Sequence, residues 1–146
     1  MTALPADAGG AGPVRVLLVD DNPINLLVAR EMLLSLDCAV ESADDGAEAL
    51  ARLQREKFDL VLMDVQMPVL DGLEATRRLR AHEAAGGTPR AVVVALTANA
   101  TAGDRDVCLG AGMDDFIAKP VHREQLAAML QRWLPAGRWR NPALPG

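Results

Sequence analysis

The sequence predicts an α/β fold in which five parallel strands form one doubly wound (βα)5 sheet with helices on both faces. The first observation behind this prediction is that short aliphatic runs alternate with longer amphipathic stretches along the chain, an order typical of parallel sheets with crossover helices. The second is that apolar residues follow one another within these runs, as expected for strands buried on both faces. Half of the 146 residues are hydrophobic, which suffices for the core of one domain.

The strands are expected where aliphatic residues stand together. They are Val14–Asp20, Cys38–Ala43, Leu60–Asp64, Ala91–Thr97 and Asp115–Ala118. The helices are expected in the stretches that follow each strand. They are Ile24–Leu36, Gly46–Glu56, Gly72–Ala84, Thr101–Gly110 and Arg123–Leu134.

Each helix carries a signal of where it begins or ends. Pro23 suits the first turn of the first helix, and Asp44-Asp45-Gly46 is a start signal for the second. Asp71-Gly72 marks the turn before the third, and glycines at 110 and 112 bracket the end of the fourth. The fifth ends before Pro135. Its apolar face is formed, at helical spacing, by Leu126, Met129, Leu130, Trp133 and Leu134.

Polar residues gather at the carboxyl ends of these strands, where ligands of such sheets bind. They are Asp20 and Asp21 after the first strand, Asp64 in the third, Thr97 in the fourth and Lys119 after the fifth. Three carboxylates that share a pocket repel one another unless a cation is bound or a proton is shared, and oxygen ligands suit Mg²⁺ (or Mn²⁺). With Lys119 and Thr97 on the phosphoryl oxygens and Asp64 as nucleophile, the pattern predicts phosphoryl transfer.

Four segments, in this order, resemble the receiver domain of two-component response regulators, above all the receivers of hybrid histidine kinases. They are "LLVDDNPIN", "DLVLMDVQMPVLDG", "VVALTANA" and "DDFIAKPV". The resemblance covers about Val14 to Leu134 and implies a flavodoxin-like domain that accepts a phosphoryl group from a phosphohistidine. We therefore expect a flexible segment over residues 1–13, a receiver domain over 14–134 and a flexible tail over 135–146.

The resemblance also implies how the metal is held and where the phosphoryl group goes. Asp64 is the implied phosphoacceptor. Asp21 and Asp64 would ligate Mg²⁺ directly, Asp20 would act partly through water, and Gln66 would offer its backbone carbonyl. Gln66, together with Asn99, also occupies a position that tunes the rate of autodephosphorylation in similar domains.

A switch is implied at two further positions. Thr97 and Phe116 match the pair that moves when similar domains are phosphorylated, and Lys119 matches the residue that binds the phosphoryl oxygen. Phe116 replaces the commoner Tyr, so a switch step that uses a tyrosine hydroxyl is not expected here. The Lys119-Pro120 bond matches a position where the peptide is cis.

The first helix shows two apolar stripes. The stripe expected to face the sheet consists of Asn25, Val28, Ala29, Met32 and Leu36. The second consists of Ile24, Leu27 and Leu34. It is either part of a broad buried face or a docking surface for a helical-bundle phosphodonor, which is how similar receivers use this helix.

Other conspicuous residues have structural explanations. Asp71 and Asp104 are expected as turn or cap residues. Asp114-Asp115 opens a strand, so this acid pair is expected at the edge of the sheet opposite the other carboxylates. Trp139 could anchor a partner, but its Pro- and Gly-rich surroundings favour a disordered tail.

Two other functions share parts of the pattern. A metal-dependent phosphohydrolase would use the same nucleophile, but the second acid usual two residues later is Gln66 here. A pure interaction domain is disfavoured because all five expected pocket residues are present. No P-loop or Rossmann glycine motif is found, so ATP is not an expected substrate.

Composition narrows the partners. The net charge of −5 argues against an intrinsic nucleic-acid surface, and no 18-residue apolar stretch indicates a membrane span. Cys38 and Cys108 form no CxxC pair, which favours reduced thiols and a cytoplasmic location. The expected partner is a histidine kinase or histidine phosphotransfer domain, and the expected state is a monomer. The chain is either a single-domain regulator or a receiver from a larger kinase.

Overall fold

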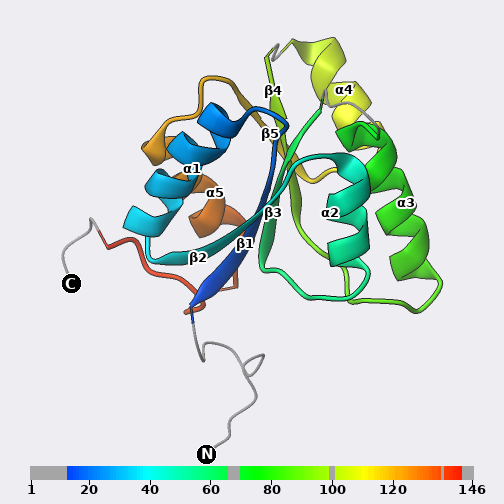
Figure 1. The fold of residues 1–146 in the computed structure, drawn as a ribbon, viewed down its shortest axis with the longest axis horizontal. Coiled ribbons are helices and arrows are strands. Elements are labelled where there is room, and N and C mark those ends of the chain that lie inside the picture. Colours follow the sequence, from blue (N-terminus) through cyan, green and yellow to red (C-terminus); the bar gives the residue numbers. More distant parts are fainter. Residues whose placement is uncertain (1–12, 66–69, 99–100, 136, 143–146) are drawn as a thin grey trace, which may run out of the picture.

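Five aliphatic segments pair in parallel as one sheet, and helices cover both of its faces (Figure 1). The strands are β1 (Val14–Val19), β2 (Cys38–Ala43), β3 (Leu60–Asp64), β4 (Val93–Thr97) and β5 (Asp115–Ala118). Their order in the sheet is β2-β1-β3-β4-β5, so the predicted α/β fold class is confirmed. This computed structural model describes residues 13–65, 70–98, 101–135 and 137–142.

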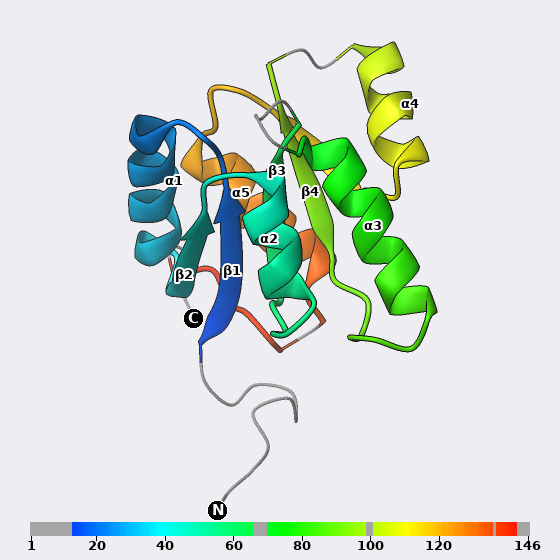
Figure 2. The ribbon, with the colours of Figure 1, turned by 45° about the vertical axis from the view of Figure 1, so that its right-hand side comes forward.

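Alternation along β1 divides the interior into two cores. Val16 and Leu18 point to one face, and Leu17 and Val19 point to the other; all four are buried. The first core is closed by α1 (Pro23–Ser35) and α5 (Arg123–Trp133). The second is closed by α2 (Gly46–Leu53), α3 (Gly72–Ala84) and α4 (Ala102–Gly110). Figure 2 shows α2 and α3 side by side on their face of the sheet. Because both faces are covered, the strands need apolar residues at consecutive positions.

The helix starts follow from capping chemistry. The Asn22 side chain accepts a hydrogen bond from the Ile24 amide at the start of α1. Asp45 and Asp71 accept from the amides three residues later at the starts of α2 and α3. Their predicted role as start and cap residues is therefore confirmed, because each satisfies an amide that the first helical turn leaves without a partner.

The sheet-facing stripe of α1 differs from the expectation. Ala29 and Leu33 are buried in this helix, and Leu26 is half-buried, whereas Asn25 and Val28 are exposed. Leu26, Ala29 and Leu33 recur at helical spacing, so the predicted stripe was displaced around the helix by about one residue. Val28 consequently joins the exposed apolar face.

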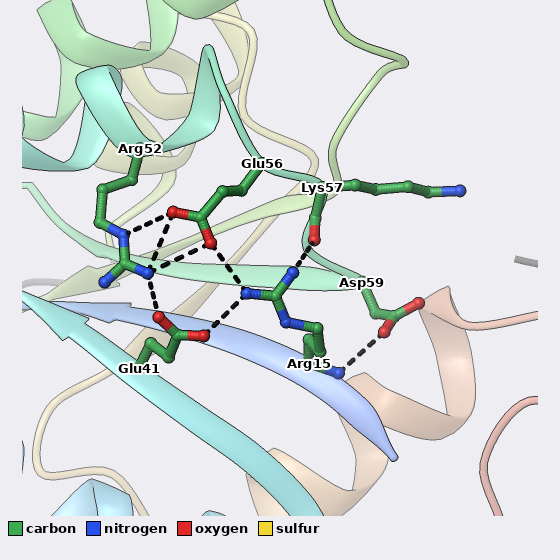
Figure 3. A network of polar contacts seen from close by, with 6 residues as sticks. All are labelled: Arg15, Glu41, Arg52, Glu56, Lys57 and Asp59. Atoms are coloured by element: carbon green, nitrogen blue, oxygen red, sulfur yellow. Dashed lines mark hydrogen bonds and ion pairs between the residues drawn. The ribbon is translucent and has the colours of Figure 1, made fainter. Parts of the chain in front are cut away.

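A charged network ties together the end of the sheet remote from the strand-end carboxylates (Figure 3). The Arg15 guanidinium on β1 pairs with Glu41 of β2 at 2.7 Å and with Glu56, after α2, at 3.0 Å. Arg52 of α2 pairs with the same two carboxylates. Arg15 also lies 4.4 Å from the centroid of the Phe58 ring, a cation–π contact. This network connects β1, β2 and α2 through ion pairs between their side chains.

Trp139 and Arg138, within the region expected to be a flexible tail, pack on the domain. Trp139 is 9% exposed and belongs to the core beneath α1 and α5. Its indole Nε1 donates to the Leu36 carbonyl at 2.8 Å, and the Arg138 guanidinium pairs with Asp59 at 2.9 Å. An apolar ring with a satisfied N–H is stable in such a position. None of the described helices has the length and apolar character to cross a membrane.

Candidate functional site

The strand order brings two carboxylates together at the carboxyl edge of the sheet. β1 and β3 are neighbours, and the chain leaves them toward opposite sheet edges, which leaves a crevice between their ends. Asp20 directly after β1 is 2% exposed, and Asp64 at the end of β3 is 4% exposed. Asp21 is exposed beside them. One carboxylate oxygen from each of the three lies within 4.8 Å of the others.

Lys119 supplies a positive charge to this cluster. Its Nζ lies 3.0 Å from Asp64 Oδ2 and 3.5 Å from Asp20 Oδ2. Burial alone would lower the pKa of Lys119, but the hydrogen bond and charge of Asp64, with the charge of Asp20, raise it above its ordinary value. The Lys119 amide donates to the Thr97 carbonyl at 2.8 Å, and the Lys119-Pro120 bond is cis, as expected.

The cluster fits a hard divalent cation. Asp20, Asp21 and Asp64 offer only oxygen ligands at a spacing that one ion can bridge. Lys119 offsets only part of their charge, because one ammonium faces three carboxylates. The Asn22 amide donates to Asp20 Oδ1 at 2.9 Å, which fixes the orientation of that carboxylate. These residues would hold Mg²⁺ or Mn²⁺.

These side chains line one cavity of about 280 Å³. Thr97, at the end of β4 and 9% exposed, lies on its wall with Lys119 and the three carboxylates. A second cavity of about 240 Å³ lies next to it, with Val28 of α1 and Pro120 in its wall. The two share Asp20, Asn25 and Lys119. The strand-end residues predicted from the sequence are therefore gathered at one place.

Three predicted residues lie elsewhere or outside the described structure. Phe116 is half-buried in β5 and packs on the core beneath α2, α3 and α4. The Arg105 guanidinium of α4 lies 5.9 Å from its ring centroid. Gln66 and Asn99 fall outside the described residues.

The proposed partner stripe is exposed on α1. Ile24 is 69% exposed, Leu27 59% and Leu34 43%, so the alternative of a broad buried face is wrong for these three residues. Val28, 46% exposed, extends the stripe toward the cavity that contains Pro120.

Asp104 was missed as a pocket residue by the sequence reasoning. Thr101 caps α4, and its Oγ1 accepts from the Asp104 amide at 3.2 Å, so the cap at this helix start is Thr101. The Asp104 side chain lines the same cavity as Asp64 and Lys119. The Thr-x-x-Asp spacing signals only a helix start, and a pattern of this kind does not say which cavity the acid borders.

The second acid pair lies at the opposite edge, as predicted. Asp114 Oδ2 accepts from the Val93 amide at 2.9 Å, where β4 begins. The Asp114 carboxylate also pairs with Arg80 and Arg90. Asp115 accepts from the Trp133 indole and from Arg132. These acids anchor α3 and α5 to the sheet.

Comparison with known proteins gives one consistent result. The sequence profile described as response regulator receiver domain matches residues 16–131. The chain is 45% identical over 129 residues to the sensor protein GacS of Pseudomonas syringae pv. syringae, covering 88% of this chain but only 14% of that protein. The chain thus spans about one-seventh of the length of this relative.

Solved structures agree with this match. One is the receiver domain of sensor histidine kinase PA1611 from Pseudomonas aeruginosa PAO1, with magnesium coordinated in its active site cleft. It is 48% identical, with a TM-score of 0.75 over 84% of this chain and 98% of that one. Another comes from the complex of the Saccharomyces cerevisiae histidine phosphotransfer protein Ypd1 with the receiver domain of Ssk1. It is 29% identical, with a TM-score of 0.78 over 84% and 89% of the two chains.

Proposed function

The chain belongs to the response regulator receiver family, and from this premise we propose that Asp64 accepts a phosphoryl group from a phosphohistidine. The observation that carries the proposal is the contact of Lys119 Nζ with a buried Asp64 at 3.0 Å, inside a cavity that three more acidic residues line. The donor would be a histidine kinase or a histidine phosphotransfer domain, in two-component or phosphorelay signalling.

The chemistry follows from how Asp64 is held. Lys119 contacts Oδ2, and a carboxylate oxygen of Asp64 attacks phosphorus as the histidine N–P bond breaks. The electron pair of that bond stays on the imidazole nitrogen. Lys119 neutralises charge on the phosphoryl oxygens, and the Thr97 hydroxyl donates a hydrogen bond to one of them. Bound Mg²⁺, held by Asp20, Asp21, Asp64 and the Gln66 carbonyl, would supply further charge neutralisation.

The phosphorylated domain would be a switch with two conformations. Thr97 lies at the cavity wall. Phe116 lies on the neighbouring strand β5, paired with Ala95 of β4, and under Arg105. Movement of Thr97 toward the phosphoryl group would change the packing of Phe116, which lacks a hydroxyl and so acts through packing alone. Water attack on the acyl phosphate would return the domain to its resting state, and no external substrate is converted.

This proposal is tested with acetyl phosphate and Mg²⁺ as the only additions. We expect the intact mass to rise by one phosphoryl group, the gain to require Mg²⁺, and the gain to be lost in Asp64→Ala. Binding of beryllofluoride, a phosphoryl mimic, provides the second measurement, because a short phosphoryl lifetime would hide the mass gain. Absence of both responses, or a mass gain that persists in Asp64→Ala, would refute the assignment.

The apolar stripe of α1 supports a docking role for the phosphodonor. We expect Leu27→Glu to slow phosphoryl transfer from a histidine phosphotransfer domain at least tenfold, because a charge in an apolar contact is costly to desolvate. Phosphorylation by acetyl phosphate should be unchanged, since Leu27 does not line the acidic cavity. Leu109→Glu on α4, where the leucine is 41% exposed, is the matched control. Equal effects of the two variants would contradict the docking role.

The setting of the domain is also proposed. Cys38 and Cys108 are free and buried, and two cysteines without a disulfide suit a reducing cytoplasm. Burial raises the pKa of both thiols, that of Cys38 to about 12, so both are expected to be unreactive. We infer a monomer that binds neither nucleic acid nor membrane and takes part in the phosphorelay of a hybrid histidine kinase.

A further inference from the structure

Asp104 places a fourth carboxylate at the acidic cavity, from an element other than the strand ends. It lies in the first turn of α4, is half-buried, and borders the cavity together with Asp64, Thr97 and Lys119. It therefore borders the space that a phosphoryl group on Asp64 would enter.

A local contact holds the Asp104 carboxylate in place. Thr101 Oγ1 lies 2.8 Å from Asp104 Oδ2 and 3.2 Å from the Asp104 amide nitrogen. The hydroxyl donates to the carboxylate and accepts from the amide, so the first turn of α4 fixes both the backbone and the charge. A positioned charge acts on its neighbours more strongly than one on a freely rotating side chain.

We propose that Asp104 shortens the lifetime of the phosphoryl group on Asp64 by electrostatic repulsion, an inference that rests on the proposed function. Phosphorylation adds negative charge to the cavity, because a carboxylate of charge −1 becomes an acyl phosphate of charge close to −2. Asp104 opposes this added charge and does not have to touch the phosphoryl group.

Hydrolysis relieves the repulsion. The oxygen of water bonds to phosphorus, the bond from phosphorus to Asp64 breaks, and its electron pair returns to the carboxylate. Inorganic phosphate leaves, and the released proton passes to solvent. Only the part of the repulsion that is lost before the transition state changes the rate. For an extra unit charge at roughly 8 Å and an effective dielectric constant between about 40 and 80, Coulomb's law therefore sets an upper limit of about two- to sixfold on the change in phosphoryl lifetime.

The same charge has the opposite effect on a cation. A carboxylate at the cavity wall attracts Mg²⁺, so its removal weakens Mg²⁺ binding while it prolongs the phosphorylated state. A loosened α4 would not produce this pair of changes, because structural loss of the cavity wall would weaken both states. A longer phosphoryl lifetime together with weaker Mg²⁺ binding therefore indicates an electrostatic effect of Asp104.

The test compares Asp104→Asn with Asp106→Asn. Asp106 lies on the same helix, is exposed, and is not among the residues that line the cavity, so its replacement removes the same charge elsewhere. Each protein is phosphorylated with acetyl phosphate at saturating Mg²⁺, the donor is removed by rapid desalting, and the decay is followed by intact mass. Mg²⁺ affinity of the unphosphorylated proteins is measured by calorimetry, and thermal melting checks the fold.

We expect a longer lifetime, by up to about sixfold, and weaker Mg²⁺ binding for Asp104→Asn, with values close to wild type for Asp106→Asn. The difference should shrink in about 1 M salt, where the Debye length falls to about 3 Å, and Asp104→Glu should restore the short lifetime. A lifetime that is unchanged or shortened, or equal effects at both positions, would overturn the inference. Failure of the wild-type protein to be phosphorylated would instead refute the proposed function.

Discussion

Replacing Lys119 with methionine should destabilise the metal-free protein by about 2–3 kcal/mol and slow phosphorylation about 100-fold. The substitution keeps the aliphatic stem but leaves Asp20 and Asp64, both nearly fully buried, without the ammonium that contacts them. Breaking a buried ion pair on one side costs about 3–5 kcal/mol. The Lys119 side chain is 25% exposed, so solvent screening reduces that figure. The kinetic loss is that of one positioned donor to the transferring group.

Urea denaturation in EDTA measures the loss of stability. Lys57→Met, which removes the charge of an exposed lysine at the far end of the sheet, is the matched control and should be neutral. Mg²⁺ should narrow the gap between Lys119→Met and wild type, because it binds the folded carboxylates. Adding Asp64→Asn to Lys119→Met should recover part of the lost stability. Additive losses in the double variant would contradict the coupling of these two residues.

The pH dependence of this effect has a definite sign. Lys119 has a pKa raised above its ordinary value in the folded state, so its contribution is fully present below the unfolded pKa of about 10.4. The contribution is lost as pH rises through the folded pKa. The stability difference between wild type and Lys119→Met should therefore be insensitive to the titration of Lys119 at neutral pH and disappear only in strong alkali.

The sequence could predict the strand-end residues because topology alone positions them. Parallel strands place their carboxyl ends at one edge, so Asp20, Asp64, Thr97 and Lys119 had to meet once five alternating units were recognised. Their meeting depends on the parallel arrangement of the backbone. No side-chain rotamer has to be known.

Asp104 and the sheet-facing stripe of α1 depend on finer information. The predicted sheet-facing stripe of α1 was displaced by about one residue. It therefore included Val28, which is exposed, and omitted Leu33, which is buried. The spacing of apolar residues shows that a helix has an apolar side. When two apolar stripes are present, as in α1, the spacing does not decide which of them faces the sheet. The position of Asp104 at the cavity wall depends on how α4 leaves β4, which tertiary packing decides.

The segment after α5 shows a different limit of sequence reasoning. Proline and glycine around Trp139 argue correctly against a helix, but they do not exclude packing. The partners of Trp139 and Arg138 include Leu36, Asp59 and Pro13, which are far away in the chain. Only the folded domain brings them within reach of the indole and of Arg138, so no local pattern could reveal these contacts.

Trp139→Ala should therefore destabilise the domain by about 3–5 kcal/mol, the range measured for truncation of large buried aromatic residues. It opens a cavity in the core beneath α1 and α5 and removes the donor to the Leu36 carbonyl, next to the C-terminus of α1. Urea denaturation with far-ultraviolet circular dichroism measures the change, and Trp139→Phe separates its two parts. Phenylalanine keeps most of the buried apolar surface and loses only the hydrogen bond, so we expect about 1–2 kcal/mol for it.

Amide hydrogen exchange shows which part of the domain is destabilised. If the indole supports the end of α1, amide exchange near Leu36 should accelerate more in Trp139→Ala than exchange in α3 on the other face of the sheet. Deletion of the residues after Leu134 should destabilise the domain at least as much as Trp139→Ala, because it also removes the pairing of Arg138 with Asp59. A deletion that leaves the free energy of unfolding unchanged would show that the segment is a dispensable tail. Since a domain of this size is stable by only about 5–15 kcal/mol, the predicted loss would place the functional C-terminal boundary of the domain beyond Trp139 and not at the end of α5.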